Sequence, residues 1–232
     1  MNKFKLLVLS GVLLCTTQAA MAQDSTYISN EYAKAVALLN RAQRYNDGAL
    51  TKQALMEMAI LSPGDTAVLR SLAEIYFGNG QYVSSAMVSL DMLNMHPNNI
   101  YAQEIAALSY ENLRLYDKAI EQYESMWLAT DNTSILYQIS YLQYLQDRFE
   151  EAKTNLTILE SKSKAEDTIT LSMQDGNSQE VSFAAGIANL RGLIAKDQGD
   201  KEAARGFFTK ALEISPEFEA PKISLTELNQ GN

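Results

Sequence analysis

The spacing of its tyrosines constrains this chain more than any other feature of the sequence. Tyr76, Tyr110 and Tyr144 are separated by 34 residues each, and Tyr82 and Tyr116 repeat the same step. A period of this length indicates that the chain repeats one supersecondary unit. Because such a unit cannot bury its apolar face alone, each copy is expected to stack on the next.

Each repeat is predicted to form a helix, a tight turn and a second helix. Apolar residues from Val68 to Tyr76 recur at helical spacing, and the run stops at Gly78-Asn79-Gly80. A second run begins at Tyr82 and stops at Pro97. A small residue early in each second helix lets the two helices approach closely; these residues are Ser85, Ala119, Ala152 and Ala204.

The segment "NLRGLIAKDQGDKEAARGFFTKALEISPEF" resembles the tetratricopeptide repeat (TPR). The matching residues are Gly192, Ala195, Gly199, Ala204, Phe208, Ala211 and Pro216. "NLRG" carries one residue more than the family's usual Leu-Gly. The resemblance implies an all-α, right-handed superhelical solenoid of about five helix pairs over residues 32–218. The repeats are placed at about 32–65, 66–99, 100–132, 133–160 and 185–218, with a C-terminal capping helix and tail at 219–232.

The period breaks between the fourth and fifth repeats. Ala152 and Ala204 are 52 residues apart, which is 18 more than one repeat, and the excess lies at about 161–184. Residues alternate there, with Ile169, Leu171 and Met173 on one side and Thr168, Thr170 and Ser172 on the other. This alternation, followed by Gly176-Asn177, predicts an inserted β-hairpin. An extended pair of helices with a polar loop is the alternative. The insertion is either a functional loop or a tolerated surface insertion, and the sequence does not decide between them.

The first 22 residues have the features of a secretory signal peptide. Lys3 and Lys5 precede the apolar stretch Leu6–Cys15, and Ala20–Ala22 forms a small-x-small cleavage site. We therefore expect export to a bacterial periplasm or cell envelope, with residues 23–31 as an N-terminal segment. The apolar stretch is too short to be a transmembrane span. Lipoprotein anchoring at Cys15 is the alternative, and Leu14 argues against it because a small residue is expected there.

Charge and residue usage restrict the partners. Removing residues 1–22 takes away two lysines and no acidic residue, which changes the net charge from −9 to −11. Without a basic patch, we expect no binding to nucleic acid or anionic lipid. Cys15 is the only cysteine and His96 the only histidine. The mature chain is therefore expected to have no disulfide, no zinc site and no cofactor.

No motif in the sequence points to catalysis. Gly78-Asn79-Gly80 lies between two predicted helices and not after a strand, so it does not form a phosphate-binding loop. His96 precedes Pro97 at a predicted helix end, where capping is its expected role. We therefore expect a protein that is not an enzyme.

The resemblance implies that the first helices line a concave groove and present four positions to it. In the fourth repeat these positions are Ser134, Tyr137, Tyr141 and Tyr144, whose tyrosines form one stripe. A tyrosine stripe suits peptide capture, because each ring offers a large, stiff contact area with a polar tip. The alternatives are that Tyr144 packs in the repeat core and that the hairpin covers Tyr137 and Tyr141. The other candidate groove residues are Tyr101, Glu104, Leu108, Glu111, Asn189, Leu193 and Lys196.

The expected function is a non-catalytic scaffold or adaptor that binds a protein or peptide in the groove. Some TPR proteins bind a C-terminal carboxylate with basic residues, and Arg70, Glu74, Glu104 and Leu108 do not provide that set. The alternative is a structural subunit of a larger envelope or secretion complex, which docks through the hairpin and the convex face. The sequence does not determine the partner or the oligomeric state.

Overall fold

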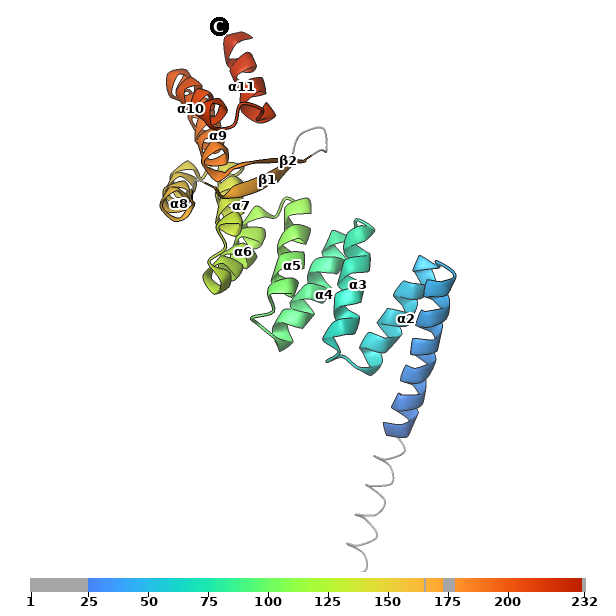
Figure 1. Ribbon diagram of the computed structural model, residues 1–232. Coiled ribbons are helices and arrows are strands. Elements are labelled where there is room, and N and C mark those ends of the chain that lie inside the picture. The colour runs from blue at the N-terminus through green and yellow to red at the C-terminus, as the bar shows by residue number, and fades with distance from the viewer. Residues whose placement is uncertain (1–24, 165, 173–177, 231–232) are drawn as a thin grey trace, which may run out of the picture. The chain divides into compact units, whose positions relative to one another are not determined.

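The computed structural model describes residues 25–164, 166–172 and 178–230 (Figure 1). The expected signal peptide, Met173 and Gly176-Asn177 lie outside these ranges. A first helix covers residues 25–44, so part of the expected N-terminal segment is helical. The later elements are α2 (Gly48–Leu61), α3 (Thr66–Gly78), α4 (Tyr82–Met95), α5 (Ile100–Asn112), α6 (Tyr116–Thr130), α7 (Thr133–Tyr144), α8 (Phe149–Lys162), β1 (Thr168–Ser172), β2 (Ser178–Ser182), α9 (Phe183–Asp197), α10 (Lys201–Ile214) and α11 (Glu219–Gln230). No helix among the described residues is long and apolar enough to cross a membrane.

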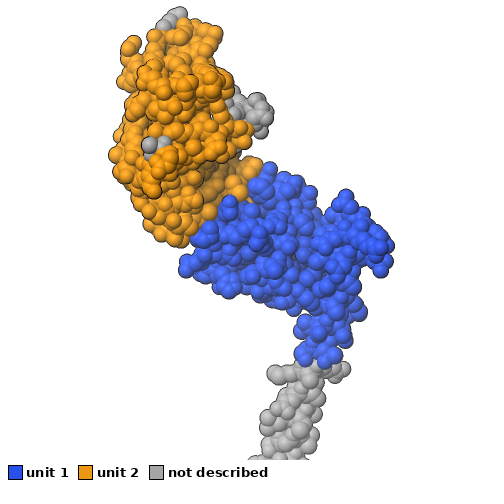
Figure 2. All heavy atoms as spheres, viewed as in Figure 1, with its two compact units in different colours: residues 1–105 blue, residues 106–232 orange. Residues whose placement is uncertain are grey.

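The chain divides into two compact units. Unit 1 comprises residues 1–105 and unit 2 comprises residues 106–232 (Figure 2). The division falls within α5.

Local sequence sets where the helices begin and end. The Asp47 carboxylate accepts a hydrogen bond from the Leu50 N–H at 3.0 Å, and Asp65 and Asn132 cap α3 and α7 in the same way. These side chains satisfy N–H groups that have no partner within the helix. Gly80 and Gly199 have φ values of 69° and 83°, which glycine adopts without steric cost. They form the tight turns before α4 and α10.

In unit 1, α3 packs closely against α4. Ser85 is fully buried, and its hydroxyl donates to the Ala73 carbonyl at 3.0 Å. The small residue predicted at this position therefore touches the backbone of the preceding helix. The surrounding core is made of Leu55, Leu69, Leu72, Val88 and Met92.

In unit 2, the small residues Ala119, Ala152 and Ala204 are fully buried. The tightest approach joins α9 to α10, where Gly192 faces the buried ring of Phe208. Leu136, Leu156, Leu190 and Phe218 complete the buried interior. The structure has the all-α repeat fold that the sequence predicts, helix pair by helix pair.

The insertion is a β-hairpin, and the helical alternative is wrong. β1 and β2 pair antiparallel, with Ile169 opposite Val181. Both of these side chains are buried, whereas Thr168, Thr170 and Glu180 are exposed. The predicted alternation therefore gives the hairpin one apolar face against the protein and one polar face in solvent.

Gly192→Ala is expected to lower the free energy of unfolding by about 1–3 kcal/mol. An added Cβ would lie 2.5 Å from Cε1 and 2.6 Å from Cδ1 of Phe208, whose ring is fully buried. Urea unfolding followed by circular dichroism measures the change. The matched control is Gly206→Ala on α10, where an added Cβ meets nothing within 4 Å. That change should raise stability by about 0.5–1 kcal/mol. Equal stability of the two variants would contradict the close approach of α9 and α10.

Candidate functional site

Tyr137, the first candidate groove tyrosine, is buried beneath the insertion. Its exposed fraction is 4%, and its hydroxyl donates to the Gly186 carbonyl at 3.2 Å. A Cβ at Gly186 would lie 3.4 Å from Cγ2 of Ile169 and 3.5 Å from Cε2 of Tyr137. The ring also packs edge-on against Phe183, and burial raises the pKa of the Tyr137 hydroxyl. The hairpin and the start of α9 therefore cover this tyrosine, and its role in binding stays a prediction.

Tyr141, one turn further along α7, stays open. Its exposed fraction is 37%, and its ring centroid lies 6.1 Å from that of Tyr144. Burial of its hydroxyl raises the pKa of Tyr141, and the nearby Tyr116 and Glu111 raise it further. Tyr141 is therefore partly exposed, within electrostatic range of a carboxylate and a second phenol.

Tyr144 links α7 to the end of α9. Its hydroxyl donates to Oδ2 of Asp197 at 2.8 Å, and its ring lies 6.3 Å from that of Phe149. Burial raises the pKa of Tyr144, and the Asp197 hydrogen bond and charge raise it further. Tyr144 is half-buried, so its side chain both packs against neighbouring residues and forms part of the protein surface.

Glu111 provides the negative charge of this surface. The Gln138 amide donates to its Oε2 at 2.9 Å. Burial raises the pKa of Glu111, while hydrogen bonds from Tyr123 and Gln138 lower it. Sequence reasoning did not select Tyr116 or Gln138 as site residues. We call Glu111, Tyr116, Tyr141 and Tyr144 the tyrosine–carboxylate surface.

The candidate residues on α9 are already engaged or covered. The Asn189 side chain is 5% exposed, and its Oδ1 has no hydrogen-bond partner among the described residues. Leu193 packs with the buried cluster around Phe208. Nζ of Lys196 lies 2.9 Å from Oε2 of Glu227 on α11. The structure therefore places these residues in contacts within unit 2 and does not bring them into an open site.

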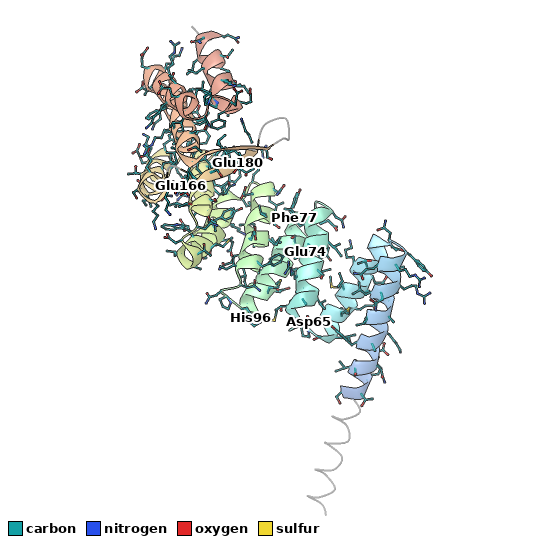
Figure 3. The ribbon with its side chains drawn as sticks, viewed as in Figure 1. Asp65, Glu74, Phe77, His96, Glu166 and Glu180 are labelled. Carbon is teal, nitrogen blue, oxygen red and sulfur yellow. The ribbon has the colours of Figure 1, made fainter. Side chains whose placement is uncertain are left out.

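Unit 1 contains a separate polar cluster, in which Tyr101 joins two residues of α3. Its hydroxyl donates to Oε1 of Glu74 at 2.5 Å, and the Arg70 guanidinium carbon lies 4.0 Å from the ring centroid. Nε of Arg70 also contacts Glu74 at 3.1 Å. Burial and, to a smaller extent, Glu74 raise the pKa of Tyr101 to about 12. The hydrogen bond from Tyr101 lowers the pKa of Glu74, and Arg70 lowers it further. Figure 3 labels Glu74 on α3. Glu104, the other candidate in unit 1, is exposed.

Comparison with known proteins supports the repeat assignment. Residues 185–218 match the family model for the tetratricopeptide repeat. A TPR protein from Parabacteroides merdae has a TM-score of 0.63 and 16% identity, over 86% of this chain and 72% of that one. A MamA protein has a TM-score of 0.61 and 12% identity, over 82% of this chain and 94% of that one.

A third solved structure is YrrB, described as a TPR protein with an unusual peptide-binding site. It has a TM-score of 0.61 and 11% identity, over 81% of this chain and 88% of that one. No curated protein sequence matches the chain. Residues 185–218 therefore match a TPR, and the chain has the fold of TPR proteins.

The candidate site within the described ranges is polar and aromatic. No group of three or more His, Cys, Asp or Glu residues in the described ranges could hold a metal ion. The tyrosine–carboxylate surface combines a negative charge with aromatic ring faces. Such faces attract cationic side chains through the ring quadrupole.

Tyr137→Phe is expected to lower the free energy of unfolding by about 0.5–1.5 kcal/mol, because it removes one buried hydrogen bond. Denaturant unfolding measures this loss, and amide hydrogen exchange at Ile169 and Val181 reports whether the hairpin loosens. Tyr141→Phe, in which the ring is kept at an exposed position, is the control and should leave stability within about 0.5 kcal/mol of wild type. If both variants are equally stable, the contact between Tyr137 and Gly186 does not stabilise the fold.

Tyr101 is expected to ionise at about pH 12, above the ordinary tyrosine pKa of 10.0. Because its pKa is raised in the folded state, its contribution to stability is complete below pH 10 and is lost as the pH rises towards 12. The tyrosinate absorbance of wild type minus that of Tyr101→Phe isolates this titration. Glu74→Gln should lower the Tyr101 pKa but keep it above 10.0, because burial is the larger cause. An ordinary pKa in wild type would contradict the cluster geometry.

Proposed function

We propose that this protein is a non-catalytic scaffold or adaptor that binds a protein or peptide through the tyrosine–carboxylate surface of unit 2. The observation that carries the proposal is Tyr141. It is the most exposed tyrosine of the predicted stripe, and it lies within electrostatic range of Glu111. Stiff aromatic rings contribute large contact areas at low entropic cost, which makes them effective anchors in interfaces.

The surface favours a partner segment with basic side chains. Glu111 is held by Gln138, and the ring faces of Tyr141 and Tyr144 lie in the same part of the unit. A lysine or arginine placed here would gain an aromatic face and the attraction of the Glu111 charge, although Oε1 of Glu111 is itself buried. The net charge of −9 favours the same kind of partner at longer range.

The fold comparisons support protein binding in general. YrrB is described as having a peptide-binding site, and it shares the fold at 11% identity. Likeness at that level concerns the fold, so the proposal that this chain binds peptides rests on its own Tyr141 and Glu111.

We also propose that the protein acts outside the cytoplasm, in the periplasm or cell envelope. The charge pattern and cleavage site of residues 1–22 support export, and Leu14 argues against lipid attachment at Cys15. N-terminal sequencing of the mature protein tests this proposal, with Gln23 expected first.

A second candidate function is a structural subunit of a larger complex. Second helices of unit 1 carry exposed apolar residues one turn apart: Met56 and Ile60 on α2, and Val83 and Met87 on α4. Exposed apolar positions of this kind mark surfaces that pack against other proteins. This function predicts that the protein co-purifies in fixed ratio with a large assembly through those residues, and not through Tyr141.

Tyr141→Ala is expected to weaken binding of the partner at least about tenfold, which corresponds to about 1.4 kcal/mol. The partner is first isolated from native envelope extract with wild-type bait and identified, and its dissociation constant is then measured by titration calorimetry. The expected affinity also falls with added salt, because the contact is partly ionic.

Leu128→Ala is the matched control for this experiment. Leu128 lies on α6 in the same unit with an exposed fraction of 79%, and it lies outside the tyrosine–carboxylate surface. Its loss should leave the dissociation constant unchanged. If Tyr141→Ala binds like wild type while Ile60→Ala and Met87→Ala release the partner, the structural-subunit function replaces the proposed one.

A further inference from the structure

The hairpin has an open backbone edge, which is unusual in a chain built of helices. Backbone groups inside a helix bond one another, but each strand of a two-stranded sheet leaves half of its N–H and C=O groups without a partner in the sheet. β1 and β2 are the strands of the described residues, and they form one such sheet. This makes the hairpin the place where another chain can add main-chain hydrogen bonds.

The hydrogen-bond pattern shows which groups face outward. The Phe183 N–H donates to the Asp167 carbonyl at 3.0 Å, so this pair is hydrogen-bonded. Hydrogen-bonded pairs alternate along an antiparallel ladder. With the observed register, the N–H and C=O groups of Ile169 and Leu171 on β1 therefore point towards β2. The N–H and C=O groups of Thr168 and Thr170 point away from β2. They have no backbone partner within the described ranges.

β1 lacks the features that usually protect such an edge. Its sequence, TITLS, contains no charged residue, proline or glycine, and threonine and isoleucine favour extended backbone. Thr168 and Thr170 are exposed. β2 differs because it carries Glu180, whose Oε1 accepts from the Thr168 hydroxyl at 2.6 Å.

The protein holds the hairpin in place. Ile169 and Val181 are buried, and Ile169 lies beside Tyr137 and Gly186. The Gln179 amide donates to the Glu217 carbonyl at 2.6 Å, and its Oε1 accepts from the Glu219 N–H at 3.1 Å. The hairpin is thereby fixed at both its apolar face and the start of α11. An edge that is ordered before binding loses less entropy when a partner adds to it.

We propose that β1 receives an extended, basic segment of a protein partner as a third strand. This inference rests on the proposed function, because it describes how a bound protein would be recognised. Main-chain hydrogen bonds to Thr168 and Thr170 would supply affinity without a fixed partner sequence. Two exposed acidic side chains favour positive charge in that segment: Glu180 lies on β2, and Glu166 lies two residues before β1 (Figure 3).

The test uses the mature protein and an octapeptide of alternating lysine and valine with both ends blocked. Amide hydrogen exchange is followed residue by residue by NMR. In the free protein, the outward amides of Thr168 and Thr170 should exchange faster than those of Ile169 and Leu171. Saturating peptide should slow exchange at Thr168 and Thr170 at least about tenfold, the protection expected of a new ladder worth about 1.4 kcal/mol. An octapeptide of alternating glutamate and valine should not do so.

A matched pair of controls separates strand addition from other binding. Thr170→Pro removes an outward N–H and leaves the ladder to β2 intact, so it should abolish peptide binding while Ile169 stays protected. If that variant does not fold, the peptide itself provides the control. N-methylation of alternate residues removes the N–H groups on one edge of the peptide and should abolish protection when they face β1.

Several outcomes would overturn the inference. They are no binding of the lysine–valine peptide, equal binding by Thr170→Pro or by both N-methylated registers, and binding without protection at Thr168 and Thr170. A wild-type dimer that Thr170→Pro converts to a monomer would show that a second copy occupies the edge. Binding that depends on Tyr141 but leaves β1 unprotected would support the proposed function and refute strand addition.

Discussion

The close approach of paired helices is the constraint on which the rest of the structure depends. Ser85 touches the backbone at Ala73 in unit 1, and Gly192 meets the ring of Phe208 in unit 2. A larger side chain at either position would separate the two helices, and the residues that each pair presents to its neighbour would shift with it. The small residues recur at the repeat period because every pair needs the same contact. The positions of Tyr101 and Tyr141 are consequences of that packing.

The hairpin covers part of the surface that the packed helices would otherwise expose. Ile169 and Val181 are buried, and Ile169 packs beside Tyr137 and Gly186. Burying the Tyr137 ring costs its hydroxyl contact with water, which the Gly186 carbonyl replaces. The insertion thus removes one tyrosine from the exposed stripe and adds an exposed strand in the same unit. Tyr141 is left to present the aromatic face, and Thr168 and Thr170 present the backbone.

Features set by residues close together in the sequence could be predicted from it, whereas features set by contacts between distant residues could not. Helix pairs, their small-residue contacts and the hairpin followed from patterns local to each repeat, because spacing and turn residues determine them. The fate of Tyr137 depends on Gly186, 49 residues away, and that of Tyr144 on Asp197, 53 residues away. The tyrosines would show the same helical periodicity whether they line a groove or lie under an insertion. Tyr116 was not selected because, in the sequence, it served only as a marker of the 34-residue period.

Acidic residues lie near both candidate binding features of unit 2, which are the exposed Tyr141 and the edge of β1. Glu111 lies beside Tyr141, and Glu180 lies on the exposed face of the hairpin. Two lysines elsewhere in the unit are paired with acids, Lys196 with Glu227 and Lys162 with Asp131. Exposed ion pairs of this kind add little stability, but they neutralise the cations that would otherwise repel a basic segment. A basic, extended partner would therefore meet an unbalanced negative charge at the aromatic face and at the strand edge. Neither feature alone specifies a sequence, and selectivity would come from a segment that satisfies both together.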